Sequence, residues 1–121
     1  MSRKLVAAAA ALMSCATTAD AACRMGKWQS IPNQVVQAYL HAPSGRSCTT
    51  GQSFKIARRN TFDGMKIAIA PQHGTASASG HRITYRSSPG YVGSDSFMFT
   101  IYGTTSGKPR VASVQVNVTV D

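Results

Sequence analysis

The second half of the chain alternates apolar and polar residues, and this period of two constrains the fold more than any other feature of the sequence. It is clearest in RVASVQVNVTV (residues 110–120), where valine recurs at every second position from Val114 to Val120. The runs MKIAIA (65–70), HRITYRS (81–87) and SFMFTIYG (96–103) show the same alternation. Because successive side chains of a β-strand point to opposite faces, each run predicts a strand with one buried face.

The apolar side chains of these runs are expected to meet in one core. The linking segments PQHG, SPGYVG and TTSGKP are rich in Gly, Pro and Ser, as turns require. A further run, TASAS (75–79), predicts a hairpin with HRITYRS around Gly80. The predicted core residues are Met65, Ile67, Ile69, Ile83, Tyr85, Phe97, Phe99, Ile101, Val114, Val116, Val118 and Val120.

The segment that precedes these runs has a weaker pattern. VVQAYL (35–40) is compatible with an edge strand or with a short helix, because so short a run does not let periodicity decide. SFKIARR (53–59) predicts a strand with Phe54 and Ile56 on one side, and NTFDG (60–64) predicts a turn.

Together these elements predict an all-β protein, an Ig-like Greek-key β-sandwich of about seven strands built from about 100 residues. Residues 54–121 are expected to form the core of a single Ig-like domain. Residues 22–53 are expected to form an N-terminal segment in front of it.

The beginning of the chain has the features of an export signal. Arg3 and Lys4 precede an apolar run from Leu5 to Met13, and ADA (19–21) fits the small-x-small rule for cleavage. The run is shorter than the roughly 20 residues that a membrane-spanning helix needs. We therefore expect a signal peptide over residues 1–21, no transmembrane span, and a periplasmic or secreted mature protein.

The three cysteines of the chain have different expected fates. LMSC (12–15) resembles the bacterial lipobox, so the alternative to plain cleavage is a protein anchored to the envelope by a lipid on Cys15. Cys23 and Cys48 remain in either case, and in an oxidising compartment they predict a disulfide. The alternative is two free thiols. A bridge would stabilise the domain by about 3 kcal/mol and staple the N-terminal segment to it.

The stretch from PQHG to SFMFTIYG (71–103) carries a recognisable pattern: Pro-x-x-Gly-Thr, a Gly turn, a Tyr-containing strand and Gly-Tyr-x-Gly-x-Asp-x-Phe, followed by the strand of alternating valines. The matching residues are Pro71, His73, Gly74, Thr75, Gly80, Tyr85, Gly90, Tyr91, Gly93, Asp95 and Phe97. This pattern resembles the bacterial Ig-like and cadherin-like (VCBS-type) repeats of large surface adhesins, here in a single copy over about residues 65–120. The resemblance implies the sandwich fold and no particular activity.

Within this stretch, GYVGSDSF (90–97) predicts a structural corner instead of a catalytic loop. Gly90 and Gly93 let the chain turn, and Tyr91 covers the end of the core. Asp95 is expected to accept backbone hydrogen bonds where the next strand begins. Phe97 is the first buried residue of that strand.

The sequence contains no recognisable catalytic or metal-binding motif. GxSxG, HExxH and a zinc-type Cys/His spacing are absent. His73 is expected to be a turn residue, and His41 and His81 are expected to be exposed polar residues. Calcium requires clustered oxygen ligands, and only three acidic residues remain after the predicted signal. We therefore expect no enzymatic activity, no cofactor and no metal, calcium included.

The charge of the chain favours an anionic partner. Lys and Arg number 13 against 4 Asp and Glu, a formal net charge of +9. Loss of Arg3, Lys4 and Asp20 with the signal leaves 11 bases and 3 acids, a net charge of +8. Such a domain is attracted to lipopolysaccharide phosphates or acidic polysaccharide in a salt-dependent way. Nucleic acid is not an expected partner.

Six basic residues are the candidate ligand contacts. If Ile83 and Tyr85 point inward, the basic residues beside them in the strand point outward. The candidates are Lys66, Arg82 and Arg86, with a second cluster of Lys55, Arg58 and Arg59. The alternative interpretation is scattered, solvated charges that only keep the protein soluble.

The sequence thus predicts a small exported, non-catalytic Ig-like module that binds an anionic or glycan component of the cell envelope through a basic face. The alternative is an interaction or assembly subunit of an envelope protein complex. In that case an exposed strand edge pairs with the sheet of a partner protein.

Overall fold

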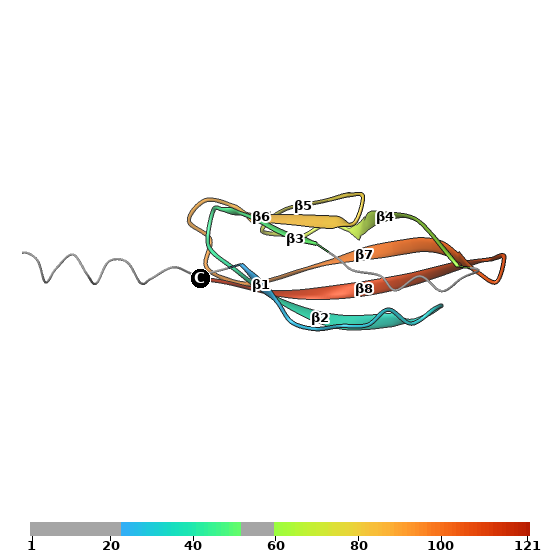
Figure 1. The fold of residues 1–121 in the computed structure, drawn as a ribbon. Helices are drawn as coiled ribbons and strands as arrows, with labels where there is room; N and C mark the ends of the chain where they lie inside the picture. The colour runs from blue at the N-terminus through green and yellow to red at the C-terminus, as the bar shows by residue number, and fades with distance from the viewer. Residues whose placement is uncertain (1–22, 52–59) are drawn as a thin grey trace, which may run out of the picture.

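The computed structural model describes residues 23–51 and 60–121, which form two stacked β-sheets (Figure 1). The larger sheet has five strands in the order β1-β2-β8-β7-β4, and the smaller has three in the order β3-β6-β5. These two ranges contain no helix, so the predicted all-β sandwich is confirmed, with eight strands instead of about seven. The strands are β1 (Arg24–Met25), β2 (Val35–Ala42), β3 (Ser47–Gly51), β4 (Thr61–Ile69), β5 (Gly74–Ser79), β6 (Arg82–Ser87), β7 (Gly93–Thr105) and β8 (Lys108–Val120).

Several predictions fall outside the described residues. They are the signal peptide over residues 1–21, the lipidation site Cys15, the strand SFKIARR (53–59), and with it the candidate contacts Lys55, Arg58 and Arg59.

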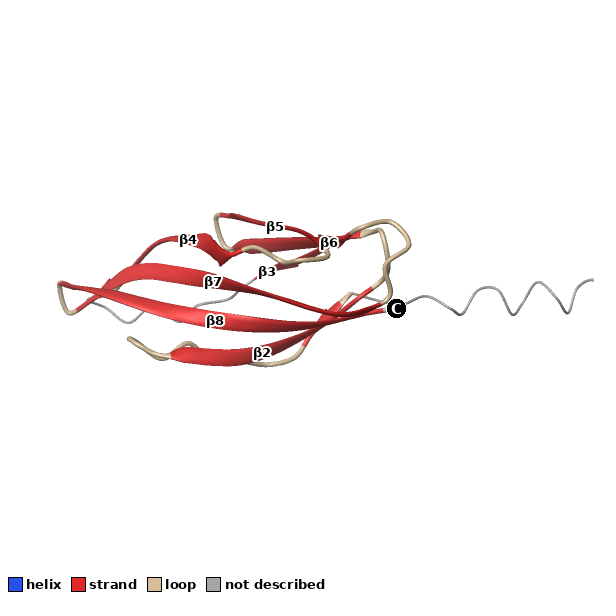
Figure 2. Ribbon diagram, turned by 180° about the vertical axis from the view of Figure 1, so that it is seen from behind, coloured by secondary structure: helices blue, strands red, loops and turns tan. Residues whose placement is uncertain are grey.

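The connections between strands follow an Ig-like Greek key. β5 and β6 form one hairpin and β7 and β8 form another, while the chain passes from one sheet to the other after β2, β3, β4 and β6. β2 runs parallel to β8, and the other neighbouring strands are antiparallel. Figure 2 shows that the long β7–β8 hairpin extends beyond the smaller sheet at one end of the molecule.

The ambiguous segment VVQAYL belongs to β2 and is therefore a strand. Its alternate residues Ala38, Leu40 and Ala42 are buried in the core. β2 is not an edge strand along its whole length, because β1 pairs with it at Leu40 and His41. Its other neighbour, β8, lies at the opposite end of the chain, which is why local periodicity did not reveal this position.

The prediction of a turn over NTFDG is wrong, because residues 61–64 begin β4 and only Asn60 precedes it. The register between β4 and β7 shifts between Phe62 and Gly64. The shift is a β-bulge with Asp63 as the extra residue, and Gly64 takes a φ of 148° that glycine tolerates. The Thr61 hydroxyl donates to the Asp63 carboxylate at 3.1 Å. Asp-Gly is a turn signal, but here it bends a strand that stays in the sheet.

The core lies between the two sheets and contains most of the predicted residues. Ile69 is the exception, with 56% of its surface exposed. A second register shift, between Ile67 and Ile69, places Ile69 beside Met98 on the outer face. Ile67 and Ile101 are half-buried at the margin of the core. The predicted residues that are buried are Met65, Ile83, Tyr85, Phe97, Phe99, Val114, Val116, Val118 and Val120.

The corner GYVGSDSF is organised by the Asp95 carboxylate. Asp95 Oδ1 accepts from the backbone N–H groups of Gln72 (3.1 Å) and Ser96 (2.9 Å). Asp95 Oδ2 accepts from the His73 N–H (3.2 Å) and from the Tyr85 hydroxyl (2.7 Å). These four bonds attach the turn after β4, and β6 of the smaller sheet, to the beginning of β7.

Tyr91 packs against this corner from outside. Its ring lies parallel to the His73 imidazole with 4.1 Å between centroids, and its hydroxyl donates to the Ser94 carbonyl. Gly93 has a φ of 139°, and a Cβ there would lie 3.1 Å from the Tyr91 hydroxyl oxygen. Gly90 has a φ of 83°. Both glycines therefore occupy backbone conformations that residues with a Cβ rarely adopt.

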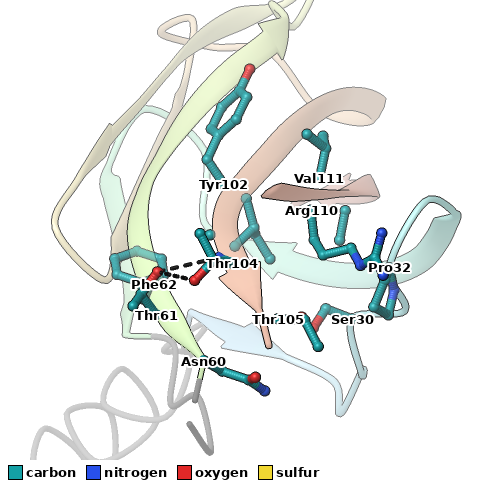
Figure 3. A pocket seen from close by; sticks show the side chains of 13 residues that line it. Ser30, Pro32, Asn60, Thr61, Phe62, Tyr102, Thr104, Thr105, Arg110 and Val111 are labelled. Atoms are coloured by element: carbon teal, nitrogen blue, oxygen red, sulfur yellow. Dashed lines mark hydrogen bonds between the residues drawn. The ribbon is translucent and has the colours of Figure 1, made fainter. Parts of the chain in front are cut away.

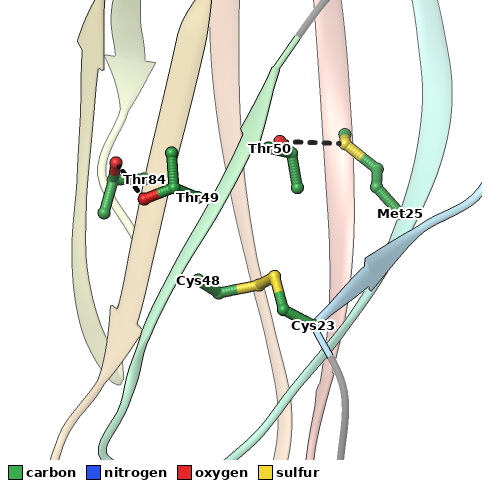
Figure 4. Close-up of a disulfide and its surroundings, with 6 residues drawn as sticks. All are labelled: Cys23, Met25, Cys48, Thr49, Thr50 and Thr84. Carbon is green, nitrogen blue, oxygen red and sulfur yellow. Dashed lines mark hydrogen bonds between the residues drawn. A yellow bond between two sulfur atoms is a disulfide. The ribbon is translucent and has the colours of Figure 1, made fainter.

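A disulfide joins Cys23 to Cys48 and links the two sheets (Figure 4). Cys23 directly precedes β1 of the larger sheet, and Cys48 is buried in β3 of the smaller one. Their Cα atoms are 5.5 Å apart, within the range of disulfides. The predicted pairing is confirmed.

Cys23→Ala is expected to lower the free energy of unfolding by about 3 kcal/mol, because the bridge restricts the unfolded chain across a sequence separation of 25 residues. This variant leaves the buried Cys48 side chain in the core and removes only the sulfur of the half-buried Cys23. Denaturant unfolding measures the change. Reductant should lower the stability of the wild type to that of the variant and leave the variant unchanged; equal stability of the variant and the oxidised wild type would contradict the prediction.

Tyr85 generates a pH-dependent prediction. The residue is fully buried and its ring stacks on Phe97 at 5.7 Å. Burial, followed by the hydrogen bond and the negative charge of Asp95, raises the pKa of the Tyr85 hydroxyl. The folded state thus favours the neutral phenol. An unfolded tyrosine loses its proton near pH 10. The stabilisation that the neutral Tyr85 hydroxyl gives the folded state is complete below that pH and is lost as pH rises above it.

Tyr85→Phe is therefore expected to lose about 1.5 to 3 kcal/mol at neutral pH, where the hydrogen bond to the carboxylate is missing. Its unfolding free energy should then fall less steeply than that of the wild type above about pH 10. Tyr39→Phe is the control, because Tyr39 is 65% exposed. Unfolding curves across the alkaline range measure both effects, and parallel curves for the wild type and Tyr85→Phe would refute this role of the hydroxyl.

Candidate functional site

Arg82 and Arg86 lie on the outer face of the smaller sheet. They belong to β6, the central strand, in which the alternate residues Ile83 and Tyr85 are buried in the core. Because side chains alternate along a strand, the two arginines and Thr84 share the outer face. The Cα atoms of the two arginines are separated by four residues of strand, or about 13 Å.

Hydroxyl side chains surround the two arginines on the neighbouring strands. The Thr49 and Thr84 hydroxyls are 2.9 Å apart and share a hydrogen bond. Three rows cross β3, β6 and β5 on this face: Ser47, Arg86 and Thr75; Thr49, Thr84 and Ser77; and Gly51, Arg82 and Ser79. We refer to these nine residues as the arginine–hydroxyl face.

No carboxylate neutralises the arginine–hydroxyl face within the part of the chain that the structure describes. Asp63 and Asp95 belong to β4 and β7 of the larger sheet. The Asp121 carboxylate is engaged by His41 Nε2 at 2.9 Å. The two guanidinium groups are therefore exposed to solvent with no carboxylate beside them.

The loop before β3 positions one of the arginines. Arg86 Nε donates to the Gly45 carbonyl at 3.1 Å, and the Gly45 N–H donates to the hydroxyl of the buried Ser87 at 2.8 Å. The Arg86 side chain is thus held by an uncharged carbonyl group and not by a carboxylate. A side chain already ordered in this way loses less conformational entropy on binding.

Lys66 lies on the opposite side of the sandwich from these arginines. It belongs to β4 of the larger sheet and points outward, since its neighbour Met65 is buried. The Lys66 ammonium lies 5.8 Å from the centre of the Tyr102 ring, a cation–π contact. Of the candidate contacts in the described residues, the structure brings together Arg82 and Arg86 and leaves Lys66 apart.

The three histidines occupy separate places in the fold. His41 pairs with Asp121, and His73 stacks on the corner tyrosine. His81, in the turn between β5 and β6, stacks on Phe62 with 4.2 Å between centroids. No three His, Cys, Asp or Glu residues of ranges 23–51 and 60–121 form a group that could hold a metal ion. The expectations about enzymatic activity and calcium remain predictions.

The hydroxyl residues of the face were absent from the sequence prediction. A signal for them exists in TASAS, where Thr75, Ser77 and Ser79 recur with a period of two. What the sequence lacks is the strand order, which places β3 and β5 on either side of β6. Only that order puts these hydroxyls next to the arginines.

No known protein family model and no curated protein matches this chain. None of the described residues form a helix long and apolar enough to cross a membrane. The chain is thus defined by its architecture, an Ig-like β-sandwich with a positively charged, hydroxyl-rich face on the smaller sheet. Its resemblance to bacterial Ig-like and cadherin-like repeats remains a prediction.

Proposed function

We propose that this protein is an exported, non-catalytic Ig-like module that binds an anionic glycan component of the cell envelope through its arginine–hydroxyl face. The observation that carries the proposal is the placement of Arg82 and Arg86 on the central strand, with hydroxyl residues beside them on both neighbouring strands. Export rests on the signal-like residues 1–21.

The chemistry of the face suits such a ligand. A guanidinium presents a planar set of donors that matches a carboxylate, phosphate or sulfate group in two-point contact. Ser and Thr hydroxyls both donate and accept, as sugar hydroxyls do. Two arginines about 13 Å apart on an open sheet favour an extended polymer with repeated charges over one small anion. The net charge of +8 that is left after loss of the predicted signal raises the rate of encounter with such a polymer.

The residues that would be obvious for catalysis have structural partners, which supports a non-catalytic role. Both oxygens of Asp95 accept hydrogen bonds from the protein. The His73 ring stacks on Tyr91, and the His81 ring stacks on Phe62. These contacts tie the side chains to the fold.

The second candidate function is a protein-interaction or assembly subunit that uses a strand edge. β5 is an edge strand of the smaller sheet, and its side chains are all small. Such an edge presents backbone N–H and C=O groups to which a partner strand can add. Pairing of this kind depends little on salt, whereas binding through Arg82 and Arg86 weakens as salt rises.

Arg82→Glu/Arg86→Glu is expected to weaken binding to immobilised acidic polysaccharide or lipopolysaccharide at low salt by at least about tenfold, because two charge-assisted contacts become repulsive. The matched control is Arg24→Glu/Lys66→Glu, which changes the net charge equally at exposed positions on the larger sheet. Retention on the matrix across a salt gradient measures the difference.

An equal loss of retention in both double variants would mean that net charge alone drives binding and would contradict a specific face. Failure of the wild type to bind any of these matrices would also contradict the proposal. Retention of an envelope protein from a membrane fraction at high salt, by the wild type and both variants, would favour the edge-strand alternative.

A further inference from the structure

A shallow pocket of about 130 Å³ lies at the end of the molecule where the β7–β8 hairpin extends (Figure 3). One side is formed by Ser30 and Pro32, which precede β2. The other side is formed by the start of β4 and by Thr104, Thr105 and Arg110 around the β7–β8 turn. The pocket belongs to the larger sheet and shares no residue with the arginine–hydroxyl face.

Arg110 occupies an unusual position in this pocket. It is in register with the buried row of β8, whose next members Ala112 and Val114 are in the core. Its partner across the strand pair is Gly103, which carries no side chain and is covered by the β4 backbone, because a Cβ there would clash with the Thr61 carbonyl oxygen. Arg110 is half-buried and forms no ion pair with a carboxylate of the described residues. A guanidinium partly withdrawn from water without an opposite charge favours an anionic ligand.

The rest of the lining combines polar groups with an apolar wall. Ser30 and Thr105 supply hydroxyls, and Ile101 and Ala112 supply apolar surface. The Thr104 hydroxyl hydrogen-bonds to the Thr61 hydroxyl at 2.8 Å instead (Figure 3). An enclosed cavity of roughly 150 Å³ holds one benzene molecule, so this open pocket has room for the ring of one sugar, whose remaining substituents extend into solvent. An inorganic anion would reach the guanidinium but leave the apolar wall and most of the hydroxyls without a contact.

We propose that this pocket binds one hexuronate unit, an acidic sugar with a pyranose ring. The carboxylate pairs with the Arg110 guanidinium, the ring hydroxyls exchange hydrogen bonds with Ser30 and Thr105, and the C–H face of the ring covers Ile101. This site goes beyond the proposed function, because it uses different residues and recognises a single sugar instead of a polymer's charge. The two sites can therefore succeed or fail separately.

The test is an NMR titration of the isotope-labelled protein with free D-glucuronate, D-glucose and inorganic phosphate. D-glucuronate is expected to shift the amide signals of Thr104 and Thr105 in a saturable way. D-glucose and phosphate should each bind there at least about tenfold more weakly, because glucose lacks the carboxylate and phosphate lacks the sugar ring. Arg110→Gln should weaken glucuronate binding at least about tenfold, and Arg110→Lys, which keeps the charge but not the planar fork, should give an intermediate loss.

Arg24→Gln is the matched control, at an exposed position outside both proposed sites, and should bind glucuronate like the wild type. Dispersed amide spectra verify that each variant is folded, and Arg110→Lys still tests the site if Arg110→Gln does not fold.

The assignment is wrong if glucuronate shifts no signals at the pocket, if Arg110→Gln and Arg110→Lys both bind like the wild type, or if phosphate binds as tightly as glucuronate. Glucuronate binding that persists in Arg82→Glu/Arg86→Glu, after polysaccharide retention is lost, supports two separate sites.

Discussion

The carboxylate of Asp95 is the interaction on which the relative position of the two sheets depends. It gathers donors from the turn after β4, from β6 and from the beginning of β7. Tyr85 belongs to the smaller sheet and Asp95 to the larger, so their hydrogen bond crosses the sandwich. Removing such an acceptor would leave its donors without partners, which costs more than the hydrogen bonds themselves contribute.

The disulfide lies next to this interaction. Cys48 is the cross-strand partner of Tyr85, so a covalent link and a charge-assisted hydrogen bond both attach the smaller sheet to the larger one at neighbouring positions. Arg86 follows Tyr85 on the opposite side of the same strand. The inner residues of β6 therefore attach this strand to the larger sheet, and its outer residues form the middle of the arginine–hydroxyl face. The same strand thus contributes to stability and to the proposed function.

Several features could be predicted because they depend on local sequence. Alternation identified β6, β7 and β8, since one-sided burial imposes a period of two on any strand. The outward direction of Arg82 followed from the burial of Ile83. NTFDG was misread because the residues that favour turns also favour β-bulges, and only pairing with β7 distinguishes them. Arg110 was missed because its pocket is built from segments that are distant in the sequence.

The sequence by itself determined the all-β class, the strands of the second half and the excess of positive charge, because each follows from residue type and short-range spacing. It also predicted the disulfide, from the two cysteines that are left after the expected signal. Tertiary structure alone decided which charges share a surface. Strand order placed hydroxyls on both sides of Arg82 and Arg86, and the division into two sheets put Lys66 on another face. The physical reason is that strand pairing joins residues far apart in the chain, and the identity of the partner strand is not encoded in the alternation of either one.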